Sequence, residues 1–170
     1  MSKHKKGAKG KRHVVSPISI AAHEAGHIVS YLSFGVRILE ASIKEDVVER
    51  FGDCYGHTSV ELNLDATLRN LAIIAMAGCA AESLTGVSEE MLESSSWNDY
   101  TIAEGLISQL TTSEEDTATV MNSIIIPQTC EFVREHLAEI AAFTEVLLEE
   151  KELDEARILE IWDHLQKSVS

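Results

Sequence analysis

Two histidines and a glutamate stand together in one short stretch, His23-Glu24-Ala25-Gly26-His27, and their spacing suits metal chemistry. Residues four apart on an α-helix lie on one face, so the rings of His23 and His27 can meet on one divalent ion. Glu24 is offset around the helix and would lie beside such an ion, where a carboxylate can take a proton from an activated water. The stretch therefore predicts a metal site with a general base.

The residues around this motif predict the helix that it needs. Ser16 and Pro17 are typical of a helix N-cap and first helical position, and Gly35 is typical of a helix end. Between them, apolar residues recur at helical spacing: Ile18, Ile20, Ala21, Ala25, Ile28, Val29 and Leu32. We therefore expect a half-buried helix over about 17–34. The competing interpretation is an amphipathic helix whose histidines are ordinary polar groups.

Two histidines leave a catalytic zinc site one protein ligand short, because such sites use three protein ligands and keep one position for water. Spacing leaves three candidates for the third ligand: His57, Glu82 and Asp99. Glu82 is either an exposed last-turn residue or a carboxylate that orients a ligand histidine. His57 is either a plain strand residue or a side chain near the site. Spacing alone does not choose among the three.

The remaining segments predict a mainly α (α+β) domain with a small two- or three-stranded sheet. Partial period-two alternation indicates strands at 36–44 and 54–62, with a charged loop at 45–53 between them. Helical periodicity predicts further helices over about 66–84, 97–109, 114–125, 127–150 and 155–165. Their expected N-caps are Asp65, Ser113 and Asp154, and Pro127 either kinks a helix or begins one.

Length and composition suit one domain over residues 15–170, preceded by a tail at 1–14 that we interpret as disordered. The longest apolar run, 71–81, is shorter than the ~20 residues that cross a bilayer. We see no secretory signal, so we expect no membrane insertion. The cysteines, Cys54, Cys79 and Cys130, show no disulfide or zinc-knuckle spacing and favour the reducing cytoplasm.

Charge is unevenly distributed along the chain. The formal net charge is −14, yet six of the 14 Lys and Arg residues lie within the first 12 positions. The acidic remainder would repel nucleic acid and anionic membrane, so nucleic acid is an unfavoured partner. The basic tail is either a solvated terminus or a contact segment for such a partner.

Three motifs in this order resemble the peptidase domain of the FtsH family of ATP-dependent zinc metalloproteases. They are His-Glu-Ala-Gly-His, then Ala-Met-Ala-Gly-Cys-Ala-Ala-Glu-Ser-Leu at 75–84, then Asn-Asp at 98–99. The resemblance spans about 16–167. It implies Zn²⁺ held by His23, His27 and Asp99, with Glu24 as general base. It also implies hydrolysis of peptide bonds in unfolded or extended protein substrates.

The sequence departs from that family in several places. It shows no ATPase module and no transmembrane segment, so we expect an endopeptidase that is ATP-independent by itself. A separate ATPase or adaptor and a homo-oligomer are its candidate partners. Ala-Gly-Cys replaces Gly-Gly-Arg at 77–79, Ser83 replaces a second glutamate, and 88–96 is rich in Ser and Glu rather than Gly. The alternative is a non-catalytic zinc-binding interaction or regulatory module of the same fold, although a structural site does not need Glu24.

Overall fold

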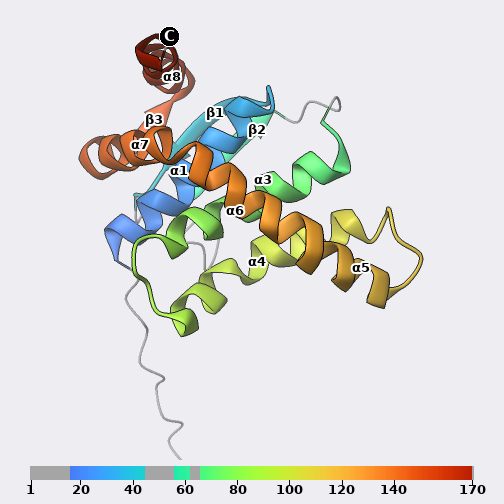
Figure 1. Cartoon of the computed structure of the whole chain (residues 1–170). Helices are drawn as coiled ribbons and strands as arrows, with labels where there is room; N and C mark the ends of the chain where they lie inside the picture. Colours follow the sequence, from blue (N-terminus) through green and yellow to red (C-terminus); the bar gives the residue numbers. More distant parts are fainter. Residues whose placement is uncertain (1–15, 45–55, 62–65, 170) are drawn as a thin grey trace, which may run out of the picture.

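A computed structural model describes residues 16–44, 56–61 and 66–169, and it confirms a mainly helical fold with a small sheet (Figure 1). The predicted tail at 1–14, the predicted loop at 45–53 and Asp65 lie outside the described residues. The elements are α1 (Pro17–Ser33), β1 (Arg37–Ser42), β2 (His57–Glu61), α3 (Leu68–Ser83), α4 (Glu89–Ile107), α5 (Glu114–Val120), the π-helix η1 (Met121–Ile125), α6 (Ile126–Glu135), α7 (Leu137–Glu150), β3 (Glu152–Asp154) and α8 (Glu155–Val169).

Helix α1 begins and ends as its sequence predicts. The Ser16 hydroxyl accepts a hydrogen bond from the backbone N–H of Ser19 at 3.2 Å, and Pro17 occupies the first turn. Gly35 follows the helix with a φ of 72°, a left-handed conformation that glycine adopts without strain. The His-Glu-Ala-Gly-His stretch therefore lies in the middle of a helix that is capped at its N-terminus.

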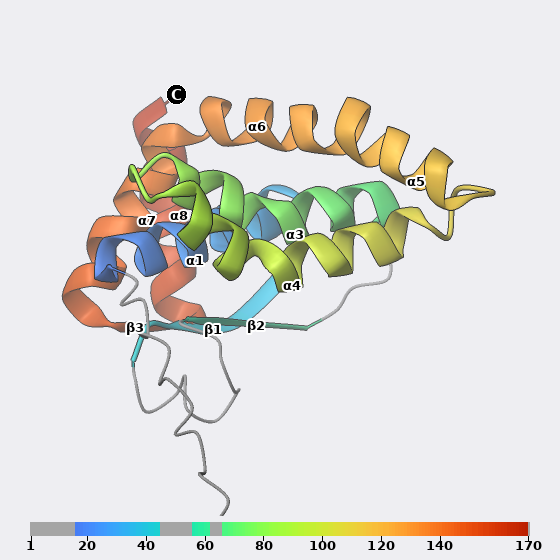
Figure 2. The same ribbon diagram turned by 90° about the horizontal axis from the view of Figure 1, so that it is seen from below.

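The three strands form an antiparallel sheet in the order β2-β1-β3. Ala41 of β1 pairs with Thr58 of β2 on one side and with Leu153 of β3 on the other. Strand β2 is consequently an edge strand within the part of the chain that the structure describes. Figure 2 shows the sheet along one side of the helices and the α5–α6 stretch along the other, with α1 and α3 between them.

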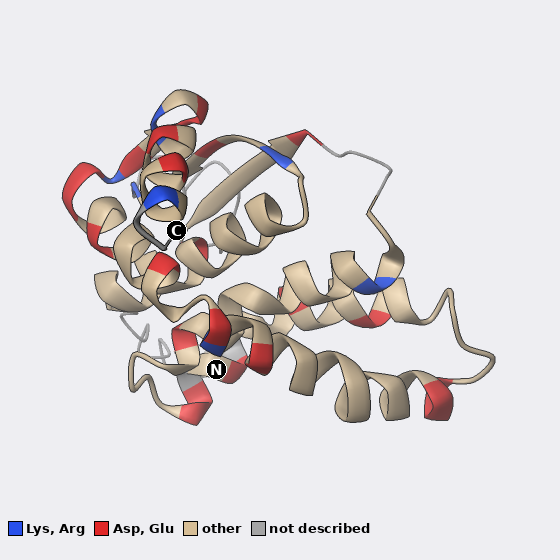
Figure 3. Cartoon of the chain, turned by 45° about the horizontal axis from the view of Figure 1, so that its top comes forward, with Lys and Arg blue, Asp and Glu red and all other residues tan. Residues whose placement is uncertain are grey.

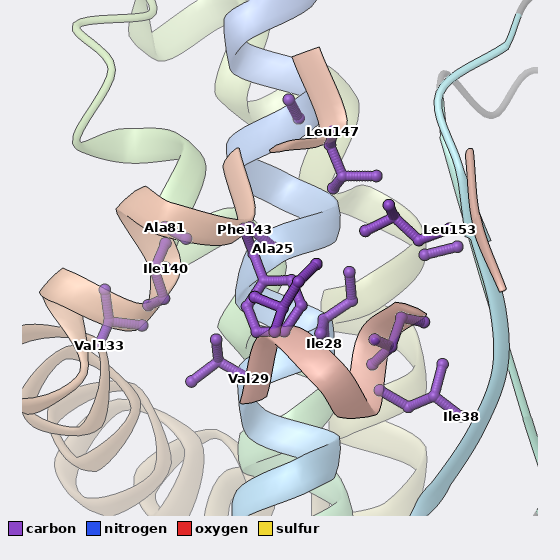
Figure 4. Packing of buried hydrophobic residues seen from close by; sticks show 14 residues of the cluster. Ala25, Ile28, Val29, Ile38, Ala81, Val133, Ile140, Phe143, Leu147 and Leu153 are labelled. Atoms are coloured by element: carbon purple, nitrogen blue, oxygen red, sulfur yellow. The ribbon is translucent and has the colours of Figure 1, made fainter. Parts of the chain in front are cut away.

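The buried apolar residues form two groups. The larger, which we call the α1 cluster, joins α1 to the sheet, α7 and α8 (Figure 4). Its buried members are Ala21, Ala25, Ile28, Val29, Ile38, Ala41, Ala81, Val133, Ile140, Phe143, Leu147, Leu153, Ile158 and Ile161. The smaller, the α4 cluster, consists of Ala72, Ala75, Ala103, Ile107, Met121 and Ile125. Helix α3 contributes to both clusters and so links them.

The structure corrects several predicted boundaries. Helix α4 begins at Glu89, eight residues before the predicted start at Trp97, so Asp99 lies within a helix instead of opening one. Within the Ser- and Glu-rich stretch, the Ser95 hydroxyl donates to Glu82 and to the backbone carbonyl of Leu92, so this serine is accommodated in the helix. Helix α3 begins at Leu68 with Thr67 as its N-cap, which replaces the predicted Asp65 cap.

The prediction of one long helix over 127–150 is also wrong, because two helices, α6 and α7, cover this stretch. Helix α5 continues through η1 into α6, with Pro127 in the first turn of α6. Proline lacks the N–H that an α-helical turn requires, and the π-helical turn just before it accommodates that loss. The chain then turns at His136, between α6 and α7. The Asp154 cap is confirmed, because its side chain accepts from the backbone N–H of Arg157 at 2.8 Å.

Acidic positions are spread over most of the helices, whereas basic ones are few (Figure 3). Several of the basic side chains are paired with acids; Arg37, for example, contacts both Glu61 of β2 and Glu155 of α8. Among the described helices, none has the length and apolar character needed to cross a membrane.

Candidate metal centre

Three side-chain atoms from two helices converge on one point. His23 Nε2 lies 3.1 Å from His27 Nε2, and Asp99 Oδ2 lies 3.1 Å from the former nitrogen and 3.5 Å from the latter. Ligand atoms placed ~2.0–2.1 Å from one tetrahedral ion are separated from each other by about 3.3–3.4 Å. The three observed separations bracket that value, so these residues could hold a metal ion.

Two further observations show that the site fits an ion. Asp99 Oδ2 is buried and accepts no hydrogen bond within the described structure, and a bound cation would satisfy it. Gly78 of α3 lies against the same point. A Cβ at this position would stand 2.4 Å from His27 Nε2 and 2.8 Å from His23 Nε2. The missing side chain of Gly78 thus keeps space open beside the converging atoms.

Each histidine is oriented from its other ring nitrogen. His23 Nδ1 lies 3.0 Å from Glu82 Oε2, and His27 Nδ1 lies 3.1 Å from the carbonyl oxygen of Ile74. Both partners are acceptors, so each Nδ1 carries a hydrogen, and Nε2 is the nitrogen that a neutral ring offers to an ion. The two rings are therefore oriented as a metal requires.

Of the three candidates for the third ligand, the structure brings only Asp99 into the group. Glu82 is 1% exposed, and it accepts hydrogen bonds from the hydroxyls of Ser19 and Ser95, each at 2.8 Å. The interpretation of Glu82 as an exposed last-turn residue is wrong, and its carboxylate contacts the His23 ring, as the orienting interpretation expects. His57 lies at the start of β2, outside the group.

The charges around the metal-free site favour a proton in place of a cation. Burial lowers the pKa of His23, but the contacts of its ring with the carboxylates of Asp99 and Glu82 and the charge of Glu24 outweigh burial and raise that pKa to about 10. Burial raises the pKa of Asp99, yet the two histidines more than offset it and hold the pKa well below its usual range. A metal ion must therefore displace a proton from His23 in order to bind.

Glu24 lies beside this site and is also fixed in place. It is 5% exposed, and its Oε2 accepts a 2.6 Å hydrogen bond from the hydroxyl of Thr58 in β2. Gly56 makes room for the other oxygen, because a Cβ there would stand 2.4 Å from Glu24 Oε1. The carboxylate is thus held where α1 meets the edge strand of the sheet.

Sequence reasoning did not find Gly56, Thr58, Gly78 or Tyr31. Tyr31 follows His27 by one helical turn, and the two ring centres are 6.3 Å apart. Burial raises the pKa of Tyr31, and the negative charges of Asp99 and Glu24 raise it further. The helical spacing from His27 was a signal that could have revealed Tyr31. Thr58 and Gly56 gave no signal, because their positions depend on how the sheet packs against α1.

Comparison with models of known protein families finds no match for this chain, and a search of curated proteins finds none either. The arrangement itself offers two imidazole nitrogens and one carboxylate oxygen to an ion, with a second carboxylate beside it. Such a mixed set suits zinc and other first-row divalent metals. With an open coordination position, it can support hydrolysis.

Proposed function

We propose that this protein is a zinc metalloendopeptidase that hydrolyses peptide bonds in unfolded or extended protein substrates. The observation that carries the proposal is that a three-atom ligand set, drawn from α1 and α4, lies beside a separate carboxylate on α1. A structural zinc site is usually four-coordinate and rich in cysteine, and it has no use for an adjacent base. Here Glu24 is kept outside the ligand set and given its own hydrogen bond from Thr58.

The roles of the residues follow from their positions. His23, His27 and Asp99 would hold the zinc ion, and Glu82 would keep the His23 ring in the required tautomer. When bound, zinc supplies Lewis-acid activation of water and of the substrate carbonyl. Glu24 accepts a proton from the attacking water, whose oxygen bonds to the carbonyl carbon. Glu24 then delivers that proton to the leaving nitrogen as the C–N bond breaks.

The edge strand β2 supports an extended peptide as the substrate. It pairs with β1 on one side, and Thr58 in this strand contacts Glu24 directly. A peptide that adds to the edge of β2 facing away from β1 by main-chain hydrogen bonds would carry its backbone past the carboxylate of Glu24. Main-chain recognition of this kind needs an unfolded segment but little sequence specificity. The resemblance to the FtsH peptidase domain favours the same class of substrate.

The proposal is tested by zinc reconstitution followed by digestion of casein and of quenched fluorescent peptides. The native protein should bind one zinc ion per chain and cleave these substrates. Glu24→Gln should keep the zinc but reduce kcat by at least about a hundredfold, because the general base is lost. Glu145→Gln, which changes an exposed glutamate on α7, is the matched control and should cleave normally.

The result also separates the alternative function. Stoichiometric zinc binding with no cleavage of any unfolded substrate would contradict the proposal and favour a non-catalytic zinc-binding module. Cleavage that persists in Glu24→Gln would show that a different group is the base, and would contradict the mechanism as well.

A further inference from the structure

Tyr31 shares a face of α1 with two members of the site. It lies seven residues after Glu24 and four after His27, so the three side chains form one stripe along the helix. Helical side chains lean towards the N-terminus of their own helix, which directs the Tyr31 ring back over the turn that carries His27. The 6.3 Å separation of the His27 and Tyr31 ring centres agrees with this direction.

Among the described residues, no hydrogen bond accounts for the presence of a hydroxyl on residue 31. Its ring is half-buried against the α1 cluster, which accounts for the aromatic body of the residue. Its hydroxyl, however, has no hydrogen-bond partner anywhere in the described ranges 16–44, 56–61 and 66–169. A phenylalanine would pack the same ring, so packing does not require the oxygen. The hydroxyl also lies within the electrostatic influence of both Asp99 and Glu24.

Building on the proposed peptidase function, we propose that Tyr31 is a further catalytic residue, which donates a hydrogen bond from its hydroxyl to the substrate carbonyl oxygen as negative charge develops there. A preformed donor acts most strongly where charge appears only in the transition state. An ordinary phenol carries its proton at neutral pH, and this protonated form is the one that donates. No bond to Tyr31 forms or breaks, and its proton stays on the hydroxyl.

The test compares Tyr31→Phe with the native protein, both loaded with zinc. The change removes one oxygen and keeps the ring, so the fold and the zinc content should be unchanged. We expect kcat to fall by about a hundredfold with little change in KM, because the lost interaction belongs to the transition state. Tyr100→Phe is the matched control, since Tyr100 is a half-buried tyrosine packed against the α4 cluster, and its kcat should be unchanged.

A second readout does not depend on turnover. A phosphinic peptide has the tetrahedral geometry of the reacting carbon, whereas a product peptide does not. Calorimetry should show that Tyr31→Phe weakens binding of the phosphinic peptide at least about tenfold and leaves binding of the product peptide unchanged. Tyr31→Ala would additionally report on the ring, and any extra loss there belongs to packing.

The outcomes separate this inference from the proposed function. If Tyr31→Phe matches the native protein in kcat and in affinity for the phosphinic peptide, Tyr31 is a packing residue and the inference is overturned. A rise in KM alone would assign Tyr31 to substrate binding and would also overturn it. If the native, zinc-loaded protein neither cleaves peptides nor binds the phosphinic peptide, the proposed peptidase function fails, and this inference fails with it.

Discussion

The two apolar clusters of this molecule differ in size and in what they contribute to the site. The buried side chains of the α1 cluster come from several helices and from strands β1 and β3. They pack against α1, the helix that contains His23 and His27. The α4 cluster is smaller and joins α3, α4 and η1 around the helix that bears Asp99. The candidate metal centre takes its two histidines from the first of these helices and Asp99 from the second. The comparison indicates that the α1 cluster positions the two neighbouring histidines, and that the α4 cluster positions Asp99, which is distant in sequence.

The largest expected effect comes from the α1 cluster. Phe143 of α7 is fully buried among Ala25, Ile28 and Val29 of α1 (Figure 4). Phe143→Ala should lower the free energy of unfolding by about 3–5 kcal/mol, because it removes a large side chain and leaves a cavity. Chemical denaturation measures this loss. Leu110→Ala, at a 60% exposed site, is the control and should change little.

The site itself should tolerate Phe143→Ala as long as the protein is folded. Phe143 packs on the apolar face of α1, opposite the ligand-bearing face. Zinc affinity, measured at a temperature where the variant is fully folded, should therefore stay within a few-fold of the native value. A destabilisation below about 1 kcal/mol would contradict the role given to this cluster.

The next effect tests the junction between the clusters. Gly78→Ala places a methyl group beside the converging ligand atoms, where the Cβ would stand 2.4 Å from His27 Nε2. Zinc affinity should fall by on the order of a hundredfold, about 2.7 kcal/mol, as the ligand atoms are forced apart. Gly105→Ala on α4 is the matched control, because its Cβ would meet nothing within 4 Å. Equal zinc affinity in both variants would contradict the assigned ion position.

The smallest effect concerns the proton that His23 of α1 carries beside Asp99 of α4 in the metal-free protein. The pKa of His23 is raised to about 10 in the metal-free protein, from the usual histidine value of 6.5. The contribution of this protonated pair to stability is complete below pH 6.5 and is lost as the pH rises through 10. Thermal midpoints should therefore fall over that range for chelator-treated protein, and His23→Asn should abolish this part of the fall.

Metal binding should report the same proton. Calorimetry in two buffers at pH 8 should show release of about one proton per zinc ion, because His23 must lose it to bind. Apparent zinc affinity should accordingly fall about tenfold, or about 1.4 kcal/mol, for each unit that the pH drops below 10. Zinc binding without proton release would show that His23 is neutral in the metal-free protein.

Sequence patterns within 16–35 predicted the part of the site that α1 contributes. Helix α1, its Ser16 cap and the shared face of His23 and His27 follow from neighbours in the sequence, so the structure confirms them. Asp99 depended on packing between α1, α3 and α4, which no spacing reveals. Resemblance to the FtsH peptidase domain supplied that residue, and the structure places Asp99 beside both histidines.

The errors arose where tertiary contacts outweigh composition. The stretch before Trp97 looks like a loop because serine disfavours helix interiors, but Ser95 bonds to its own helix and to Glu82. Strand β3 is three residues long, and its pairing with β1 creates it. No window of sequence that short carries a periodic signal.

Ser95 and Asp99 are one turn apart on α4. Asp99 contacts His23 directly, and Ser95 contacts it through Glu82. Asp99 lies beside His23 Nε2, while the Ser95 hydroxyl donates to the Glu82 carboxylate that contacts His23 Nδ1. A small displacement of α4 would break the Asp99–His23 and Ser95–Glu82 contacts together. If an ion binds here, its binding and the packing of α4 are thermodynamically coupled: a change that moves this helix outward would weaken ion binding, and a bound ion would oppose that movement.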